Sequence, residues 1–435
     1  MTRLPPDHPD RRTLADEVHA RPPEALEAPS RASCVALLVD PEQRSEEQAH
    51  LARLCEAMGV APPPAGAIHF AASLGAVRLR WERHGEFSTY TLFAAGLSPT
   101  PFTAPPTALL PEGWLGGAPG RTVFAGHAKL LRADATDPTP EFLAAHFDGE
   151  VVVGASVGGG AGMAFTDFHV HSDGFSRFLL IDRSFTPRQA GRTVQRLFEI
   201  ETYRMMAMLA LPVAREQLKR IAVIERELAE LTDEIARQTA ADETLLAALT
   251  AKAAEVERGL AASQYRFGAC RAYHALVTRR IAELRERRLS GIQTIEEFMG
   301  RRFTPAVATC ASASERLHEL SRHVAQASAL LTTRVEIARE KQNQDLLASM
   351  ARRATLQLRL QQTVEILSVA PLTYYVVAIV GYGAKALKAA GLPVEPEIAE
   401  GVAIPIVALA LILAMRWVHH RVFATLEHKG PDLEL

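Results

Sequence analysis

The chain has few cysteines and almost no excess of charge. Lysine and arginine together number 48, aspartate and glutamate number 50, and the formal net charge is −2. Because a nucleic-acid footprint needs a basic stripe, we expect no nucleic-acid partner. The four cysteines are widely spaced and form no C-x-x-C pair: Cys34, Cys55, Cys270 and Cys310. Their spacing argues against a disulfide framework and against a structural zinc site.

The N-terminus lacks an apolar run. Residues 1–32 form an arm that is rich in proline and charge, and they contain no segment like the core of a secretory signal peptide. We therefore expect the soluble part of the protein to stay in the cytoplasm, where thiols are reduced.

Phosphate-binding motifs are also missing. The glycine-rich stretch Gly154–Gly162 lacks the Gly-Lys-Ser or Gly-Lys-Thr ending of a P-loop, and strand-like residues follow it where a helix would be needed. This stretch is more typical of a hairpin connection. No complete catalytic constellation is evident either, so we do not expect an enzyme.

Short apolar or alternating segments follow the arm and predict an α+β domain over residues 33–183 with a largely antiparallel sheet. A helix is expected over 45–58, because its apolar residues share one face. The strands are expected at residues 34–39, 67–70, 76–81, 87–93, 121–131, 151–157, 162–170 and 175–181.

The rest of the chain has the pattern of long helices. Thr186-Pro187 and Thr304-Pro305 are typical helix starts, with threonine as the cap and proline in the first turn. We expect a helical, coiled-coil segment over 187–303, with breaks near Pro212 and at 240–242, and a stalk helix over 305–365. Two series with a 3–4 spacing predict the contact faces: Ile221, Ile224, Leu228, Leu231 and Ile235, then Leu317, Leu320, Val324, Ala327, Leu331 and Val335.

Two apolar segments near the C-terminus, 366–387 and 402–418, have about the length that crosses a bilayer as a helix. A short loop with prolines separates them, and residues 419–435 form a tail. Arginines precede the first segment, and Arg416, His419, His420 and Arg421 follow the second. Because positive charge marks the cytoplasmic side, we expect both termini in the cytoplasm of a bacterium, with the loop across the inner membrane.

Asp167, His169, His171 and Asp173 are the strongest metal candidates. On a strand, residues two apart share a face, so these four side chains would line one side. Imidazole and carboxylate ligands suit a divalent metal such as zinc or iron. The alternative is a half-buried strand whose polar face is exposed to solvent and binds no metal, which explains the same alternation.

Asp16, Glu17, His19 and Arg21 form a second charged motif, within the arm. Such residues could supply an acid–base pair and a clamp for an anion. The plainer interpretation is an arm that docks on the sheet through salt bridges.

The apolar segments hold small and polar residues, among them Thr373, Gly381, Tyr382 and Gly383. Small residues let helices approach closely, and hydroxyl groups can bond across them or line a pore. The tyrosines equally suit the membrane interface. No acidic residue lies within either segment, so a proton relay is not expected.

Three stretches carry a resemblance to a bacterial family of unknown function, whose members are described as predicted membrane-anchored proteins. They are Leu4-Pro-Pro-Asp-His-Pro, the segment Asp16-Glu-Val-His-Ala-Arg-Pro-Pro23 and the segment that begins Asp167-Phe-His-Val-His-Ser-Asp-Gly. The resemblance continues through residues 342–350 and 357–365 and covers nearly the whole chain. It implies no activity.

The layout also resembles that of CorA-type magnesium channels, which have an α/β cytoplasmic domain, a long stalk helix and two C-terminal spans. Pro371-Leu372-Thr373 lies at a comparable depth in the first span. Gly381-Tyr382-Gly383 stands where that family has Gly-Met-Asn, whose asparagine ring binds the hydrated cation. The resemblance therefore implies the topology and a homo-oligomer, and leaves magnesium selectivity unsupported.

Three functions fit these features. The leading hypothesis is a CorA-like oligomer in the membrane that conducts or senses an ion. The second is a membrane-anchored scaffold whose helices bind partners. The third is a membrane-tethered metalloenzyme that uses His169 and His171.

Overall fold

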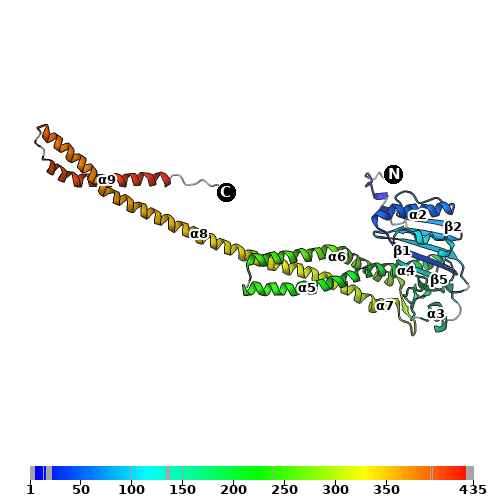
Figure 1. Cartoon of the computed structure of the whole chain (residues 1–435). Helices are drawn as coiled ribbons and strands as arrows, with labels where there is room; N and C mark the ends of the chain where they lie inside the picture. Colours follow the sequence, from blue (N-terminus) through cyan, green and yellow to red (C-terminus); the bar gives the residue numbers. More distant parts are fainter. Residues whose placement is uncertain are drawn as a thin grey trace. The chain divides into compact units, whose positions relative to one another are not determined.

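The computed structural model describes residues 5–427, apart from 13, 16–21, 99, 134–137, 150, 239, 392 and 394. These residues form two compact units, Met1–Leu331 and Thr332–Leu435. The first unit contains a sheet and long helices, and the second contains two apolar helices (Figure 1).

A nine-stranded sheet lies at the centre of the first unit, in the order β2-β3-β4-β1-β5-β8-β7-β6-β9. Neighbouring strands are antiparallel except for β5 and β8, which are parallel. This confirms the mostly antiparallel α+β fold. The strands are β1 (Ser30–Leu38), β2 (His69–Leu74), β3 (Val77–Arg83), β4 (Phe87–Ala95), β5 (Arg121–Arg132), β6 (Val153–Val157), β7 (Gly162–Thr166), β8 (Ser176–Asp182) and β9 (Arg287–Arg288).

Each face of the sheet is covered by helices. On one face, even-numbered residues of β1 and β5 pack against α4 (Pro187–Met208) in the largest core cluster. On the other face, α2 (Arg44–Ala57) covers one cluster and α3 (Pro140–His146) covers another. Three short 3-10 helices complete this part: η1 (Pro41–Gln43), η2 (Pro106–Leu109) and η3 (Leu115–Gly117).

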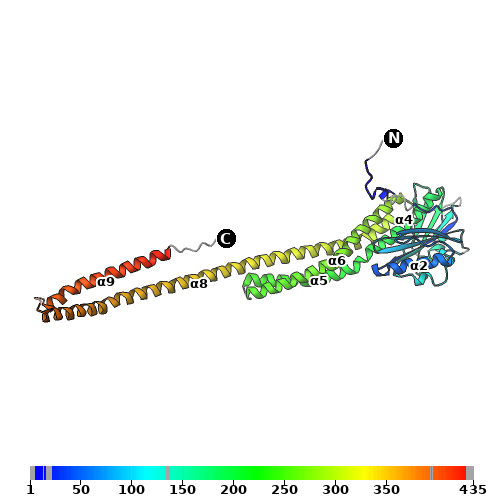
Figure 2. The same cartoon turned by 90° about the horizontal axis from the view of Figure 1, so that it is seen from above.

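Long helices follow the sheet. They are α5 (Ala210–Arg237), α6 (Asp242–Leu284), α7 (Ile295–Arg302) and α8 (Thr304–Ala389). Helices α5, α6 and the first part of α8 lie side by side (Figures 1 and 2). Arg316 on α8 pairs with Glu225 on α5 at 2.6 Å, and Ser321 on α8 donates to Glu257 on α6 at 2.7 Å. Most residues of the expected contact faces are buried, including Ile221 and Leu331. The remaining four are half-buried: Leu231, Ile235, Ala327 and Val335.

The break expected near Pro212 falls at Leu209, between α4 and α5, and Pro212 lies in the first turn of α5, where proline is tolerated. One local expectation for the helical region is wrong. Residues 285–294 are not helical, and β9 within them pairs with β6 at the edge of the sheet. The starts at Thr186 and Thr304 are as expected, and Thr186 forms a capping box with Gln189.

The second unit contains the remainder of α8 and the helix α9 (Pro396–Glu427). Both helices contain a segment long and apolar enough to cross a membrane. Only 12% of the apolar window in α8 and 0% of the window in α9 is buried. Their apolar side chains therefore lack the protein cover that the core helix of a soluble protein would have.

Candidate functional site

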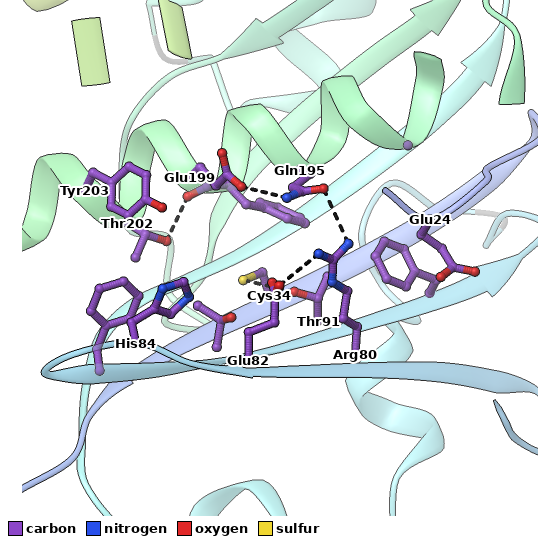
Figure 3. Close-up of a pocket in the computed structure, with 15 residues that line it drawn as sticks. Glu24, Cys34, Arg80, Glu82, His84, Thr91, Gln195, Glu199, Thr202 and Tyr203 are labelled. Carbon is purple, nitrogen blue, oxygen red and sulfur yellow. Dashed lines mark hydrogen bonds and ion pairs between the residues drawn. The ribbon is translucent and has the colours of Figure 1, made fainter. Parts of the chain in front are cut away.

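A cavity between the sheet and α4 is lined by several charged and polar side chains (Figure 3). Strands β1, β3 and β4 supply its floor, and α4 supplies its roof. The polar residues that line it include Cys34, Arg80, Glu82, His84, Gln195, Glu199 and Tyr203.

The polar side chains form a continuous chain of contacts from the sheet to the helix. Arg80 Nη2 donates to Glu82 Oε1 at 2.8 Å, and Arg80 Nη1 donates to Gln195 Oε1 at 3.4 Å. Gln195 Nε2 in turn donates to Glu199 Oε1 at 2.7 Å. The guanidinium of Arg280, on α6, pairs with the other side of Glu199. The network thus ties β3, α4 and α6 together.

Burial raises the pKa of two acidic groups that line this cavity, Glu199 and Cys34. It raises the pKa of Glu199, against the opposing charge of Arg280 and the hydrogen bond from Gln195. Burial also raises the pKa of the Cys34 thiol to about 12. Because the thiolate is the reactive form of cysteine, Cys34 is not a nucleophile at neutral pH.

The cavity is too small for a substrate of ordinary size. It offers about 40 Å³ to the centres of water-sized molecules, which is room for a few waters. Ligand pockets usually measure about 300 Å³ or more. The geometry therefore supports a hydrated structural network rather than a catalytic centre.

The end of the N-terminal arm closes this cavity. Arg80 Nη1 donates to the carbonyl of Pro22 at 3.0 Å, and the amide of Leu26 donates to Pro187 O at 2.9 Å. Arg78 pairs with Glu24 at 2.8 Å. The candidate motif of Asp16, Glu17, His19 and Arg21 lies outside the described residues, directly before this docked segment.

The candidate metal residues do not share a strand. The expected strand 162–170 is wrong in its second half, because β7 ends at Thr166 and Phe168 has a φ of 55°. That left-handed conformation interrupts the alternation on which a common face depends. Phe168 stacks on Phe298 of α7, with ring centroids 4.7 Å apart.

His171 is held by two carboxylates. Its Nε2 lies 2.8 Å from Asp167 Oδ2, and its Nδ1 lies 3.2 Å from Asp148 Oδ2. With both ring nitrogens engaged, the imidazole has no lone pair directed at a metal. Asp173 Oδ1 accepts from the amide of Phe175 at 2.9 Å. Asp167 and His169 line one hollow, and neither His171 nor Asp173 is part of its lining.

No group of three or more His, Cys, Asp or Glu side chains gathers as a metal would require within the part of the chain that the structure describes. Metal binding by Asp167, His169, His171 and Asp173 stays a prediction. The four side chains do not lie on one face of a strand, as that prediction assumed.

Two of the four candidate residues of the apolar helices line a hollow of about 500 Å³ within the second unit. Thr373 and Tyr382 line it together with Lys385 and with Glu400 of α9. Gly381 faces Glu400 so closely that a Cβ there would clash with the carboxylate, whereas nothing approaches Gly383. The sequence-based prediction started the second span at residue 402 and so left Glu400 outside it. In the structure, α9 begins at Pro396 and includes Glu400.

One contact between cysteines is not evident from their spacing. Cys270 on α6 and Cys310 on α8 are both buried, and their thiols are hydrogen-bonded to each other. That bond lowers the pKa of Cys270 and raises the pKa of Cys310. Both are free thiols, as expected from the sequence.

Comparison with known proteins places the chain in a family and assigns it no activity. A family model described as a protein of unknown function (DUF3422) matches residues 6–422. No curated protein and no solved structure matches the chain. The match covers nearly the whole sequence, which confirms the resemblance to an uncharacterised family. The protein therefore belongs to the DUF3422 family.

Proposed function

We propose that the protein is a homo-oligomeric membrane protein with a CorA-like layout that conducts or senses an ion. The lipid bilayer and further copies of the chain are its partners in this proposal. The observation that carries it is the uncovered apolar surface of α8 and α9 in the second unit.

The bilayer is the solvent that suits these two helices. The core of a bilayer is about 30 Å thick and is crossed by about 20 apolar residues in a helix. Tyr374, Tyr375 and Ile379 on α8, and Ile406 and Leu409 on α9, are all exposed. Contact between water and so many apolar side chains is unfavourable in free energy. Lipid or another copy of the chain would cover these side chains and remove this contact.

The charges next to the helices support one orientation. Arg352, Arg353 and Arg359 precede the apolar part of α8, and Arg416 lies near the far end of α9. Glu395 and Glu397 lie at the connection between the helices. By the positive-inside rule, we propose that both termini lie in the cytoplasm and that the connection lies on the other side of the inner membrane.

A face of α8 before the apolar segment supports self-association. Leu346, Met350, Leu360 and Val364 are each more than half exposed. Their separations match whole turns of a helix with about 3.6 residues per turn, so all four lie on one face. Such a stripe is typical of helices that pack against other helices, and within the described part of this unit α9 is the other helix.

An ion path requires several copies. Two helices from one chain cannot enclose a pore, whereas a ring of hairpins can. One hollow in the hairpin offers the polar groups that could face such a path. They are those of Thr373, Tyr374, Tyr382, Lys385 and Glu400. Because asparagine is absent from the Gly381-Tyr382-Gly383 stretch, the proposal does not specify magnesium.

Reconstitution into liposomes tests the function. Vesicles that contain the full-length protein should release a trapped cation faster than empty vesicles. Leu360→Glu, which places a charge on the apolar face, should abolish this flux because it blocks assembly. Gln362→Glu adds the same charge on the other side of the same turn and should preserve the flux.

Flux that is absent for every cation tested, from vesicles that contain intact oligomers, would contradict ion conduction. Membrane anchorage and assembly would then remain, as the scaffold hypothesis requires.

A further inference from the structure

A basic strip crosses the middle of the sheet, on the face that lies away from α4. Two apolar clusters flank it on this face, one under α2 with Val35 and Leu37 and one under α3 with Leu179 and Ile181. Between the clusters, the same face carries polar side chains: Arg31 and Ser33 on β1, His127 and Lys129 on β5, and Arg177 on β8.

The pairing of the strands brings these side chains together. Arg31 is the register partner of Lys129, and Ser33 is the partner of His127. His127 is in turn the partner of Arg177 on the parallel strand β8. Side chains at partnered positions lie directly opposite each other on one face, so the charges are neighbours.

Lys129 is the least compensated charge in the strip. Its relative exposure is 8%, and among the residues that the structure describes no carboxylate pairs with it. Burial lowers the pKa of its ammonium group. A buried cation is unfavourable unless an opposite charge or hydrogen-bond acceptors compensate it.

The neighbouring groups add positive charge rather than remove it. Arg31 Nη1 donates to the carbonyl of Ala104 at 2.8 Å, while its Nε is buried without an acceptor. Arg177 Nη1 pairs with Asp148 at 2.7 Å, and the Nε of Arg177 is likewise buried without an acceptor. Asp148 also binds His171, so its charge is shared among several donors.

One imidazole lies in the strip, that of His127, and a second lies close by on α3, that of His146. Burial lowers the pKa of His127 to about 4, with Asp173 raising it and Arg177 lowering it. The Nδ1 of His127 lies 2.8 Å from Ser33 Oγ, and its ring stacks on Phe175. Burial also lowers the pKa of His146, and the charge of Lys129 adds to this effect.

A small cavity lies over the strip. Arg31, His127 and Lys129 line its floor, and Phe102, Pro105 and Pro106 line its cover. It offers about 20 Å³ to the centres of water-sized molecules, which is room for a group of one or two waters in size. Phe102 has a φ of 61°, so this cover includes a residue in the left-handed region.

We propose that this cavity is a binding site for a small oxyanion of the size of formate or nitrate, held by Lys129 and Arg31 with His127 beside it. The anion supplies the negative charge that the ammonium of Lys129 lacks and the oxygen acceptor that Arg31 Nε lacks. The size of the cavity excludes a nucleotide. The site is independent of the proposed ion path, because its residues all belong to the first unit.

Thermal unfolding of the full-length protein in detergent tests the site. The protein is compared in sodium formate, sodium nitrate and sodium chloride at the same pH and ionic strength. The same series is run on Lys129→Met and on Lys219→Met, a variant at an exposed lysine of α5. Comparing variant and wild type in the same salt removes the general effect of each salt on stability.

The expected result is that formate and nitrate raise the midpoint of the wild type and of Lys219→Met relative to chloride, by several degrees. Lys129→Met should lose this difference. The same oxyanion response in Lys129→Met as in the wild type would overturn the proposal, and so would a wild type that does not distinguish oxyanions from chloride. Should Lys129→Met fail to fold, Lys129→Arg should keep the response and Arg31→Gln should lose it.

Discussion

The carboxylate of Glu47 accepts a hydrogen bond from the indole of Trp81 at 3.1 Å, and both side chains are fully buried. The same Oε1 accepts from the hydroxyl of Tyr90 at 3.2 Å, and Arg44 pairs with Oε2 at 3.2 Å. One acid on α2 therefore satisfies two aromatic donors on β3 and β4 and fixes the helix to the sheet.

Removal of this acid should destabilise the first unit strongly. Glu47→Ala leaves the indole and the phenol without an acceptor and Arg44 without its partner. We expect a loss of about 3–5 kcal/mol in the free energy of unfolding, measured by chemical denaturation. Glu56→Ala, at an exposed position of the same helix, should change it by about 0.5 kcal/mol or less. Equal effects of the two variants would contradict this role.

Gly191 should be required for docking of the N-terminal arm. A Cβ at this position of α4 would clash with the backbone carbonyl of Glu24, which cannot move without displacing the arm. Gly191→Ala should therefore expose Leu26, at a cost of about 2 kcal/mol, and speed protease cleavage of the arm.

Gly268→Ala is the matched control for that variant. Nothing lies within 4 Å of a Cβ at this position of α6, so the helix should gain about 0.5–1 kcal/mol. Protease resistance of the arm that is unchanged in Gly191→Ala would show that the close approach is not required.

The stability of the first unit should fall in mild acid because of His127. Its pKa drops from 6.5 to about 4 on folding, so below pH 6.5 the unfolded chain binds a proton that the folded protein does not. The free energy of unfolding should therefore decrease as the pH falls from 6.5 towards 4, by at most about 3 kcal/mol from this residue. His127→Gln should flatten the profile of unfolding free energy against pH over this window. A slope that is the same in the variant would assign the effect to other groups.

Oxidation should link α6 to α8. The thiols of Cys270 and Cys310 are hydrogen-bonded to each other, so a mild oxidant that reaches them should form an intramolecular disulfide. Intact-mass measurement should show the loss of two hydrogens, and peptide mapping should recover the linked pair. Cys270→Ala should abolish the product, whereas Cys55→Ala should not, because Cys55 lies on α2. Linkage through Cys34 or Cys55 instead would contradict the contact.

Sequence patterns predicted the strands and the helix starts because both have local causes. A short apolar run located β1, alternation located β3, and the Thr-Pro pairs located the starts of α4 and α8. The strand β9 has only Arg287 and Arg288 and forms by pairing with β6, so no periodicity marks it.

The sites were harder to predict, since they depend on pairings between distant segments. The positive φ of Phe168 interrupts the strand and separates the candidate metal residues. Phenylalanine is not a residue type that indicates a positive φ, so the sequence did not predict this conformation. The basic strip was missed because Arg31 and Lys129 become neighbours only through the register of β1 and β5. The contact of Cys270 with Cys310 likewise depends on the packing of α6 against α8.

The mass of the full-length protein in a lipid nanodisc or in detergent tests the proposed assembly most directly. We expect one closed oligomer of several chains, which Leu360→Glu dissociates and Gln362→Glu leaves intact. A wild-type protein that is monomeric or dimeric in both environments would contradict the proposal, because so few hairpins cannot surround an ion path.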